Sequence, residues 1–177
     1  MNTLTTTTKA AAPGGVIPRL ANLLQGIHSA MGHWPNTLLA FIARFSIAAV
    51  FWKSGQTKIE GLAIDIVGGE FTLGWPRLSD NAVFLFKEEY QLPILPPELG
   101  ATLAALGEHL LPLFILLGLA TRLSALGLLG MTLVIQLFVY PDAYATHGTW
   151  AAVLLYLMAH GPGKLSIDAW IAKRHPV

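Results

Sequence analysis

Three ionisable residues, Arg44, Glu108 and His109, lie within long apolar segments of the sequence. Ionisable groups are costly inside a membrane span, so they usually face the interior of a helix bundle and pair with one another. With a helical rise of about 1.5 Å per residue, Arg44 lies roughly 12 Å from the membrane face at which its segment begins. Glu108 lies roughly 14 Å from the opposite membrane face, at which its own segment begins. If the two segments are antiparallel, Arg44 and Glu108 form a buried pair near mid-membrane.

A carboxylate and an imidazole at membrane depth can bind a quinone head group and exchange protons with it. We therefore take Arg44, Glu108 and His109 as the candidate intramembrane polar site. A purely structural clamp is the alternative for the Arg44–Glu108 pair. The sequence has no cysteine, and no phosphate-binding or zinc-binding motif is present. We expect no built-in cofactor, take a quinone as the candidate ligand, and leave enzymatic activity open.

A second polar set lies toward the opposite ends of the apolar segments. Its members are Lys53, Gln56, Lys58, Gln136, Tyr140, Asp142 and His147. Gln136 lies inside an apolar segment, so it should form a hydrogen bond across helices. Asp142 and His147 have metal-binding side chains, but two ligands do not define a site, and no metal centre is predicted. Solvation of these residues at the membrane interface is the alternative to a binding site.

The elements that must position these residues are membrane-spanning helices. Hydrophobic residues make up 54% of the chain and charged residues 12%, about half the share of charge in a soluble domain. Between Leu99 and Val139 only Glu108 and Arg122 carry a full charge. Segments of about 20 apolar residues cross a bilayer. We predict an all-α membrane protein, a bundle of four transmembrane helices near residues 36–55, 99–119, 123–140 and 148–160, the last extending back to residue 144.

Three regions are expected along the chain. Residues 1–15 are polar and predicted to be a disordered tail. Residues 16–35 carry apolar side chains at helical spacing, which predicts an amphipathic helix on the membrane surface or against a protein. Residues 36–177 form the membrane domain. The long outer loop between the first two spans contains repeated Gly and Pro breaks and is expected to cap the outer mouth of the bundle.

The distribution of Lys and Arg predicts the orientation. With the N-terminus inside, the inner segments contain Lys9, Arg19, Arg122, Lys164, Lys173 and Arg174. The outer segments contain Lys53, Lys58, Arg77 and Lys87. This bias favours a multi-pass protein of the bacterial inner membrane with both termini in the cytoplasm. Its partners are then the lipid bilayer and a second protein or further copies of itself, whereas a formal net charge of +1 argues against nucleic acid.

From residue 39 to residue 170 the chain resembles DoxX-type membrane proteins. The pieces that carry the resemblance are Arg44 with the run to Trp52-Lys53-Ser54-Gly55-Gln56-Thr57-Lys58, then Glu108-His109-Leu110-Leu111-Pro112, residues 117–125, residues 134–142, and residues 160–168 around Gly161-Pro162-Gly163. The resemblance implies a four-helix membrane bundle and a link to respiratory redox chemistry, since relatives include a small subunit of a thiosulfate:quinone oxidoreductase. The N-terminal segment and the long first loop are extensions that the resemblance does not explain.

Residues 139–142 and 161–163 also resemble the branch of that family encoded beside copper-binding modified peptides, which implies a role in copper homeostasis. Two functions follow. The first is a redox-linked accessory subunit that binds a quinone near Glu108 and His109. The second is a non-enzymatic docking or export partner for a metal-binding peptide maturation system, in which Arg44 and Glu108 serve only the structure.

Overall fold

The computed structural model describes residues 16–32, 34–65 and 68–174, so the predicted tail at residues 1–15 lies outside the described chain. The chain divides into two units, Met1–Pro35 and Asn36–Val177. In the first unit, α1 is a helix from Val16 to Gly32. Its apolar side chains are exposed, between 48% and 83% of their surface, at Val16, Ile17, Leu20, Leu23, Leu24 and Ile27.

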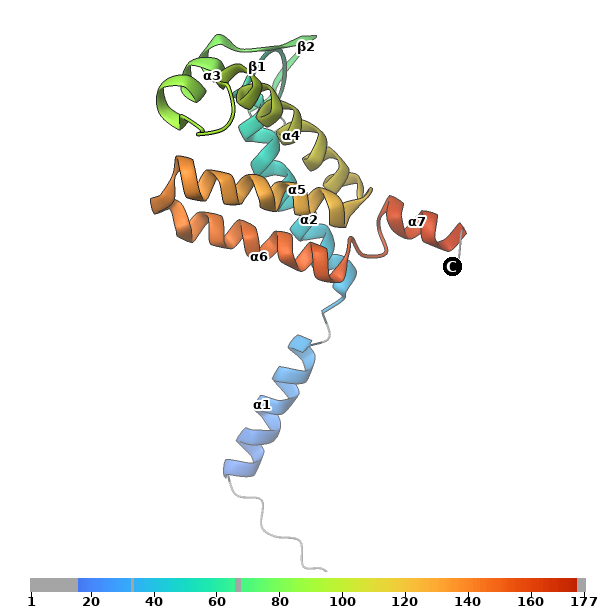
Figure 1. The fold of residues 1–177 in the computed structure, drawn as a ribbon. Helices are drawn as coiled ribbons and strands as arrows, with labels where there is room; N and C mark the ends of the chain where they lie inside the picture. The colour runs from blue at the N-terminus through green and yellow to red at the C-terminus, as the bar shows by residue number, and fades with distance from the viewer. Residues whose placement is uncertain (1–15, 33, 66–67, 175–177) are drawn as a thin grey trace, which may run out of the picture. The chain divides into compact units, whose positions relative to one another are not determined.

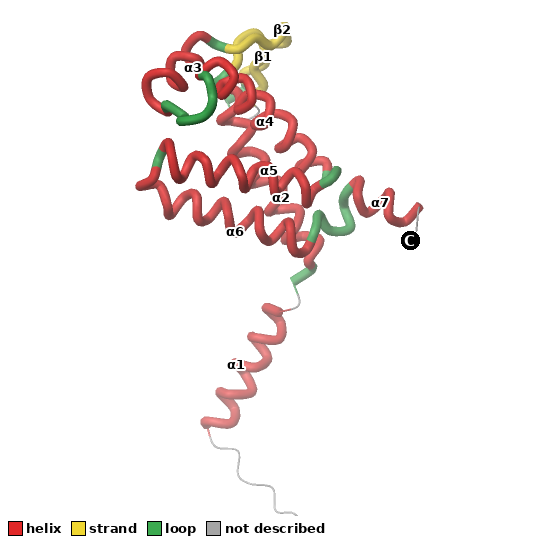
Figure 2. The backbone as a smooth tube through the Cα atoms, in the orientation of Figure 1, coloured by secondary structure: helices red, strands yellow, loops and turns green. Residues whose placement is uncertain are grey.

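Four helices form the body of the second unit (Figures 1 and 2). They are α2 (Asn36–Gln56), α4 (Pro97–Leu117), α5 (Thr121–Val134) and α6 (Tyr144–His160). A π-helical turn, η2 (Ile135–Val139), continues α5, and a short 3-10 turn, η3 (Pro141–Ala143), leads into α6. A last helix, α7 (Ile167–Arg174), follows the bundle. Because α2 packs on α4, α4 on α5, α5 on α6 and α6 on α2, the four helices close into a bundle.

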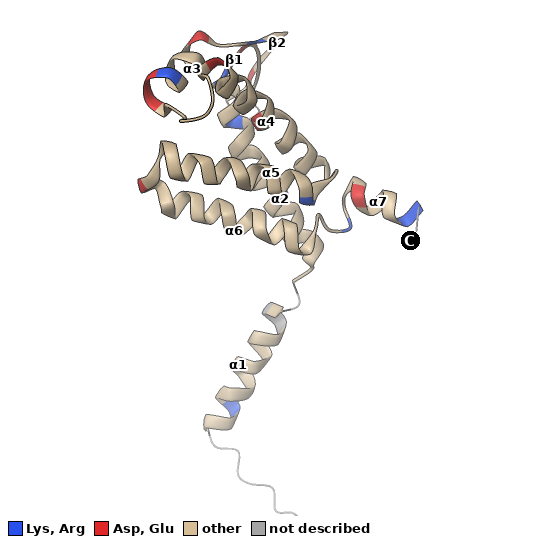
Figure 3. Cartoon of the chain, in the orientation of Figure 1, with Lys and Arg blue, Asp and Glu red and all other residues tan. Residues whose placement is uncertain are grey.

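Three of these helical segments are long and apolar enough to cross a membrane: Asn36–Gln56, Pro97–Leu117 and Thr121–Val139. Their bounds lie close to those predicted from the sequence. The core of the four-helix bundle contains Ile47, Phe51, Ile115, Leu128, Leu154 and Leu157. Many leucines instead point outward and are exposed, and charged residues gather at the ends of the bundle rather than along it (Figure 3). An apolar outer surface around a packed core is typical of a protein surrounded by lipid.

The segment between α2 and α4 contains a β-hairpin, which the all-α expectation missed. Strand β1 (Ile59–Asp65) pairs antiparallel with β2 (Glu70–Leu78), with Ile59 opposite Leu78 and Ile64 opposite Phe71. The signal was present, since β-branched and aromatic residues flank Gly68-Gly69, a composition typical of a hairpin. Next come α3 (Asp80–Leu85) and the π-helical turn η1 (Phe86–Tyr90).

The hairpin, α3 and η1 form a cap that is attached to α2 and α4. Trp52 Nε1 donates to the Ile64 carbonyl at 3.1 Å, and the Ile64 N–H donates to Gln56 Oε1 at 2.7 Å. Trp52 and Gln56 lie one turn apart on α2, so together they bind both the carbonyl and the N–H of Ile64 in β1. Ser79 accepts from the Ala82 N–H and thereby caps the first turn of α3. A small apolar cluster of Ala82, Phe86 and Ala101 packs the cap on α4.

Candidate functional site

Arg44 lies at the end of the bundle where α4 meets α5. Its Nη1 donates to the carbonyls of Pro162 and Leu165 at 2.9 and 2.7 Å, and its Nη2 donates to the carbonyl of Leu116 at 2.8 Å. The side chain is 3% exposed. The Leu116 carbonyl belongs to the last turn of α4, where carbonyls lack partners within the helix and a cation is favourable. Arg44 therefore joins α2 to the end of α4 and to the loop after α6.

Asp168 completes this junction from α7. Its two carboxylate oxygens accept from the backbone N–H groups of Ala120 and Thr121 at 2.8 and 3.0 Å, which are free donors at the start of α5. Gly118 ends α4 with a φ of +68°, and a Cβ at that position would collide with Ser166. The stretches around Gly118 and Gly161–Asp168, which carried part of the DoxX resemblance, thus form the binding loops for one buried guanidinium.

The predicted Arg44–Glu108 pair does not form, and that prediction is wrong. Leu116, which binds Arg44, follows Glu108 by eight residues, roughly 12 Å along a helix. Glu108 instead lies opposite Gly55, since a Cβ on Gly55 would lie 3.1 Å from the Glu108 Cβ. The prediction assumed that α2 and α4 cover the same depth, whereas the register places Glu108 beside the last turn of α2.

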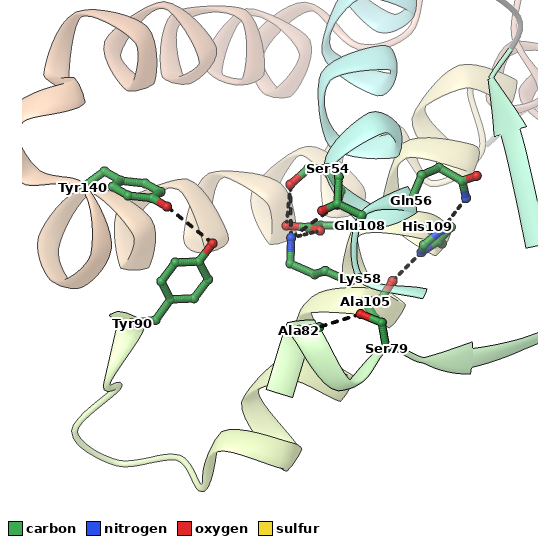
Figure 4. A network of polar contacts seen from close by, with 11 residues as sticks. Ser54, Gln56, Lys58, Ser79, Ala82, Tyr90, Ala105, Glu108, His109 and Tyr140 are labelled. Atoms are coloured by element: carbon green, nitrogen blue, oxygen red, sulfur yellow. Dashed lines mark hydrogen bonds and ion pairs between the residues drawn. The ribbon is translucent and has the colours of Figure 1, made fainter. Parts of the chain in front are cut away.

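The partner of Glu108 is Lys58, a member of the other predicted polar set. Lys58 Nζ lies 2.7 Å from Glu108 Oε2, and the two side chains are 11% and 4% exposed. The contact is a close, buried ion pair. Ser54 Oγ donates to Glu108 Oε1 at 3.2 Å, and Lys58 Nζ also lies 3.2 Å from Ser54 Oγ (Figure 4). A buried carboxylate, ammonium and hydroxyl therefore form one neutral cluster.

His109 faces away from this cluster. Its Nδ1 lies 2.6 Å from the Ala105 carbonyl, so Nδ1 carries the proton and donates it. Its Nε2 lies 2.9 Å from Gln56 Nε2. The Gln56 amide is oriented by the Ile64 N–H, which donates to Oε1, so the Gln56 NH₂ must donate to His109 Nε2. Both imidazole nitrogens are thus used, and Figure 4 shows this pair on the side of Glu108 opposite to Tyr90 and Tyr140.

The Lys58–Glu108 cluster forms part of the wall of a cavity of about 570 Å³. The cavity lies between the N-terminal half of α4 and the C-terminal end of α5 with η2, and it is bounded by α2, the cap and α6. Its wall is mostly apolar. The polar residues among the lining are Ser54, Lys58, Tyr90, Glu108, Tyr140 and His147. Leu103 and Val134 line it while 50% and 40% exposed, so the cavity has a rim on the apolar outer surface.

Tyr140 closes one side of the cavity against the cap. Its hydroxyl donates to Glu89 Oε1 at 2.8 Å. The same hydroxyl lies 3.5 Å from the Tyr90 hydroxyl (Figure 4). The Tyr90 and Tyr140 rings meet edge to face, with centroids 5.9 Å apart. The hydrogen bond with Tyr90, partial burial and the Glu89 carboxylate raise the pKa of Tyr140, so its phenol stays protonated. This contact joins η1 of the cap to the end of α5.

His147 contributes an imidazole to the same cavity from α6. It is 5% exposed, packs on Trp150, and its Nδ1 lies 2.7 Å from Gln136 Oε1. Gln136 Nε2 in turn donates to the Pro141 carbonyl at 2.6 Å. The predicted hydrogen bond of Gln136 across helices is therefore present, and it connects α5 to α6.

A family model described as DoxX matches residues 39–141, more than half of the chain. The chain belongs to the DoxX family. A curated protein from Haemophilus influenzae (strain ATCC 51907 / DSM 11121 / KW20 / Rd), described as an uncharacterized protein, is 27% identical over 144 residues, which is 76% of this chain and 84% of that protein. No solved structure matches significantly.

The DoxX match covers Arg44, Lys58, Glu108 and Tyr140 but ends before His147 and before the loop that binds Arg44. The remaining predicted residues are exposed, Lys53 in the last turn of α2 and Asp142 in η3 before α6. Within the described residues no group of three or more His, Asp or Glu side chains could hold a metal ion.

Sequence reasoning missed Ser54, Glu89, Tyr90 and Trp150. Only Ser54 had a usable signal, since it lies one turn before Lys58.

A double-mutant cycle tests the coupling of Lys58 and Glu108. Glu108→Gln leaves a buried ammonium without its counter-ion, and Lys58→Met leaves a buried carboxylate, so each should destabilise the protein by roughly 3 kcal/mol. The Lys58→Met/Glu108→Gln double variant should recover most of that loss. The measurement is thermal unfolding of the purified protein in detergent.

The exposed pair Lys87–Glu88 serves as the control, because its side chains are 66% and 52% exposed. Lys87→Met should change stability by less than about 1 kcal/mol. Additive losses in the Lys58→Met/Glu108→Gln double variant would show that the two residues are not coupled.

Proposed function

We propose that this DoxX-family membrane protein is a redox-linked accessory subunit that binds a quinone in the cavity beside Lys58 and Glu108. The observation that carries the proposal is the composition of that cavity, an apolar space with a buried ion pair in its wall. Sites for small ligands and cofactors are typically mostly apolar, with a few placed polar groups and volumes of about 300–1,000 Å³. The volume of about 570 Å³ lies within that range.

The cluster offers a quinone head group both a donor and an acceptor. The contacts of Lys58 Nζ with Ser54 are long, at 3.2 and 3.3 Å, so one can be exchanged for a ligand carbonyl. Glu108 Oε2 has Lys58 as its partner at 2.7 Å, and a carboxylate oxygen can accept more than one hydrogen bond, so it can also accept from a ligand hydroxyl. The partly exposed rim at Leu103 and Val134 gives a lipid-soluble ligand a route from the bilayer.

Reduction of a quinone takes up two electrons and two protons, and oxidation of the hydroquinone releases them, so this role requires an electron-transfer partner. We propose that the partner is a second protein at the outer face, where the cap lies. The chain's own part is to bind the head group, exclude water from it, and present Lys58 and Glu108 to its oxygens.

Quinone titration of the purified protein tests the proposal. A short-chain quinone should bind saturably, and Trp150, which lines the cavity, should report it by fluorescence. Leu103→Trp fills the rim and should weaken binding about tenfold or more, because the head group loses its space.

The matched control for the titration is Leu106→Trp, on the same helix, similarly exposed at 53% and outside the cavity lining. It should bind like the wild type. Equal binding by both tryptophan variants, or no saturable binding by the wild type, would refute the proposed site.

A docking role is the second candidate, and an apolar strip on the cap favours it. Phe71, Leu73 and Trp75 alternate along β2, so they share one face of the hairpin, and they are 64%, 84% and 86% exposed. Exposed apolar patches of this kind mark protein or membrane contacts. In this case the chain is a non-enzymatic docking or export partner for the maturation of a metal-binding peptide. The resemblance to the copper-associated branch suggests this kind of partner.

Affinity purification from native membranes tests the docking role. A stable partner should be retained by Glu108→Gln and lost when Phe71, Leu73 and Trp75 are all changed to Ser. The mass of the complex separates a second copy of this chain from a different protein. A partner recovered equally with the triple variant would refute docking through this strip.

For the topology, we propose that α6 is a fourth span and that both termini lie in the cytoplasm. With 17 residues, α6 is about 25 Å long, close to the thickness of the hydrocarbon core. Its Leu154 and Leu157 are fully buried in the bundle. Of the outer cations, Lys58 is buried in its ion pair, which leaves fewer free positive charges outside and strengthens the positive-inside bias. The exposed apolar side of α1 then lies on the inner leaflet.

Single-cysteine labelling tests this topology, because the natural chain has no cysteine. In intact inner-membrane preparations with the outer face exposed, Asp142→Cys should react with a membrane-impermeant maleimide. Lys164→Cys should react only after permeabilisation. On α1, Gln25→Cys should react faster than Leu24→Cys once the membrane is permeable. Labelling of residues 142 and 164 from the same side would exclude α6 as a span.

A further inference from the structure

The hydrogen-bond chain behind His147 determines which of its nitrogens carries the proton. The Pro141 carbonyl can only accept, so the Gln136 NH₂ donates to it, and Oε1 is the atom that faces His147. Because Oε1 can only accept, His147 Nδ1 must carry a hydrogen. The neutral imidazole then has a bare lone pair at Nε2.

Within the described residues, Nε2 of His147 has no hydrogen-bond partner, although the side chain is only 5% exposed. His147 also lines the cavity that contains the Lys58–Glu108 pair. Nε2 is not one of the fully buried polar atoms that lack a partner, so a ligand in the cavity that His147 lines can reach it and donate to it. His109, by contrast, has both nitrogens satisfied. The imidazole available to a ligand is therefore that of His147.

We propose that the cavity selects the reduced, dihydroxy form of its aromatic ligand, with His147 Nε2 accepting a hydrogen bond from one phenolic O–H. The proposal rests on quinone binding in this cavity and adds a preference for the hydroquinone. A quinone has only carbonyl acceptors, so it leaves Nε2 without a donor. A hydroquinone supplies that donor, and Lys58 and Glu108 line the same cavity.

Anaerobic calorimetry of the full chain in detergent tests the preference with four probes. These are a short-chain benzohydroquinone, its monomethyl ether, its dimethyl ether and the corresponding quinone. The wild type should bind the hydroquinone and the monomethyl ether similarly, because each has an O–H. The dimethyl ether and the quinone should bind about tenfold more weakly. An affinity that falls stepwise with each added methyl group would instead indicate exclusion by size and overturn the proposal.

His147→Phe should abolish the discrimination, since it keeps an aromatic ring beside Trp150 but lacks Nε2. Gln136→Leu is the second variant: it leaves His147 in place but frees its Nδ1, so either tautomer can form and the discrimination should decrease. His160→Phe is the control, because His160 is exposed and outside the cavity lining. Full discrimination in both His147→Phe and Gln136→Leu would overturn the assignment. If the wild type binds none of the four probes, the proposed function itself fails, whereas equal binding of all four overturns only the preference.

Discussion

The ion pair between Lys58 and Glu108 links the start of the hairpin to the middle of α4. Lys58 is the residue at which α2 gives way to the hairpin, and its carbonyl accepts from the Ser79 N–H before α3. Its ammonium reaches back to the middle of α4. Burying a charge away from water costs free energy, so each of the two side chains is stable in the protein interior only while the other is present. One contact thereby couples the cap to the bundle and contributes two of the polar residues that line the cavity.

The sequence predicted the helical segments well because long apolar runs are a property of local composition. It did not predict which charges pair. Arg44 and Glu108 were matched by equal depth, but the relative register of antiparallel helices depends on close contacts such as that at Gly55, where a Cβ would lie 2.8 Å from the His109 ring. The hairpin was missed for a different reason, since the Gly and Pro breaks around β1 and β2 outweighed their alternating pattern.

The two histidines show how a residue's chemistry depends on its second partner. His109 and His147 each bind an oxygen through Nδ1, at 2.6 and 2.7 Å. They differ at Nε2, where Gln56 donates to His109 and no described residue donates to His147. Residue type and position in a span made His109 the natural candidate. The two glutamine amides distinguish the histidines, and a backbone group orients each amide. Gln56 presents its NH₂ to Nε2 of His109, whereas Gln136 presents its oxygen to Nδ1 of His147 and leaves Nε2 available.

Arg44 has a consequence for how the protein is made. Its carbonyl partners at Leu116, Pro162 and Leu165 follow it in the chain by 72, 118 and 121 residues. When α2 leaves the ribosome, those groups have not yet been synthesised, so the helix must enter the membrane with an unsatisfied guanidinium. Assembly of the first helix is therefore completed only by the last loop. A prematurely terminated chain would retain an exposed intramembrane charge, a defect that cellular quality control can recognise.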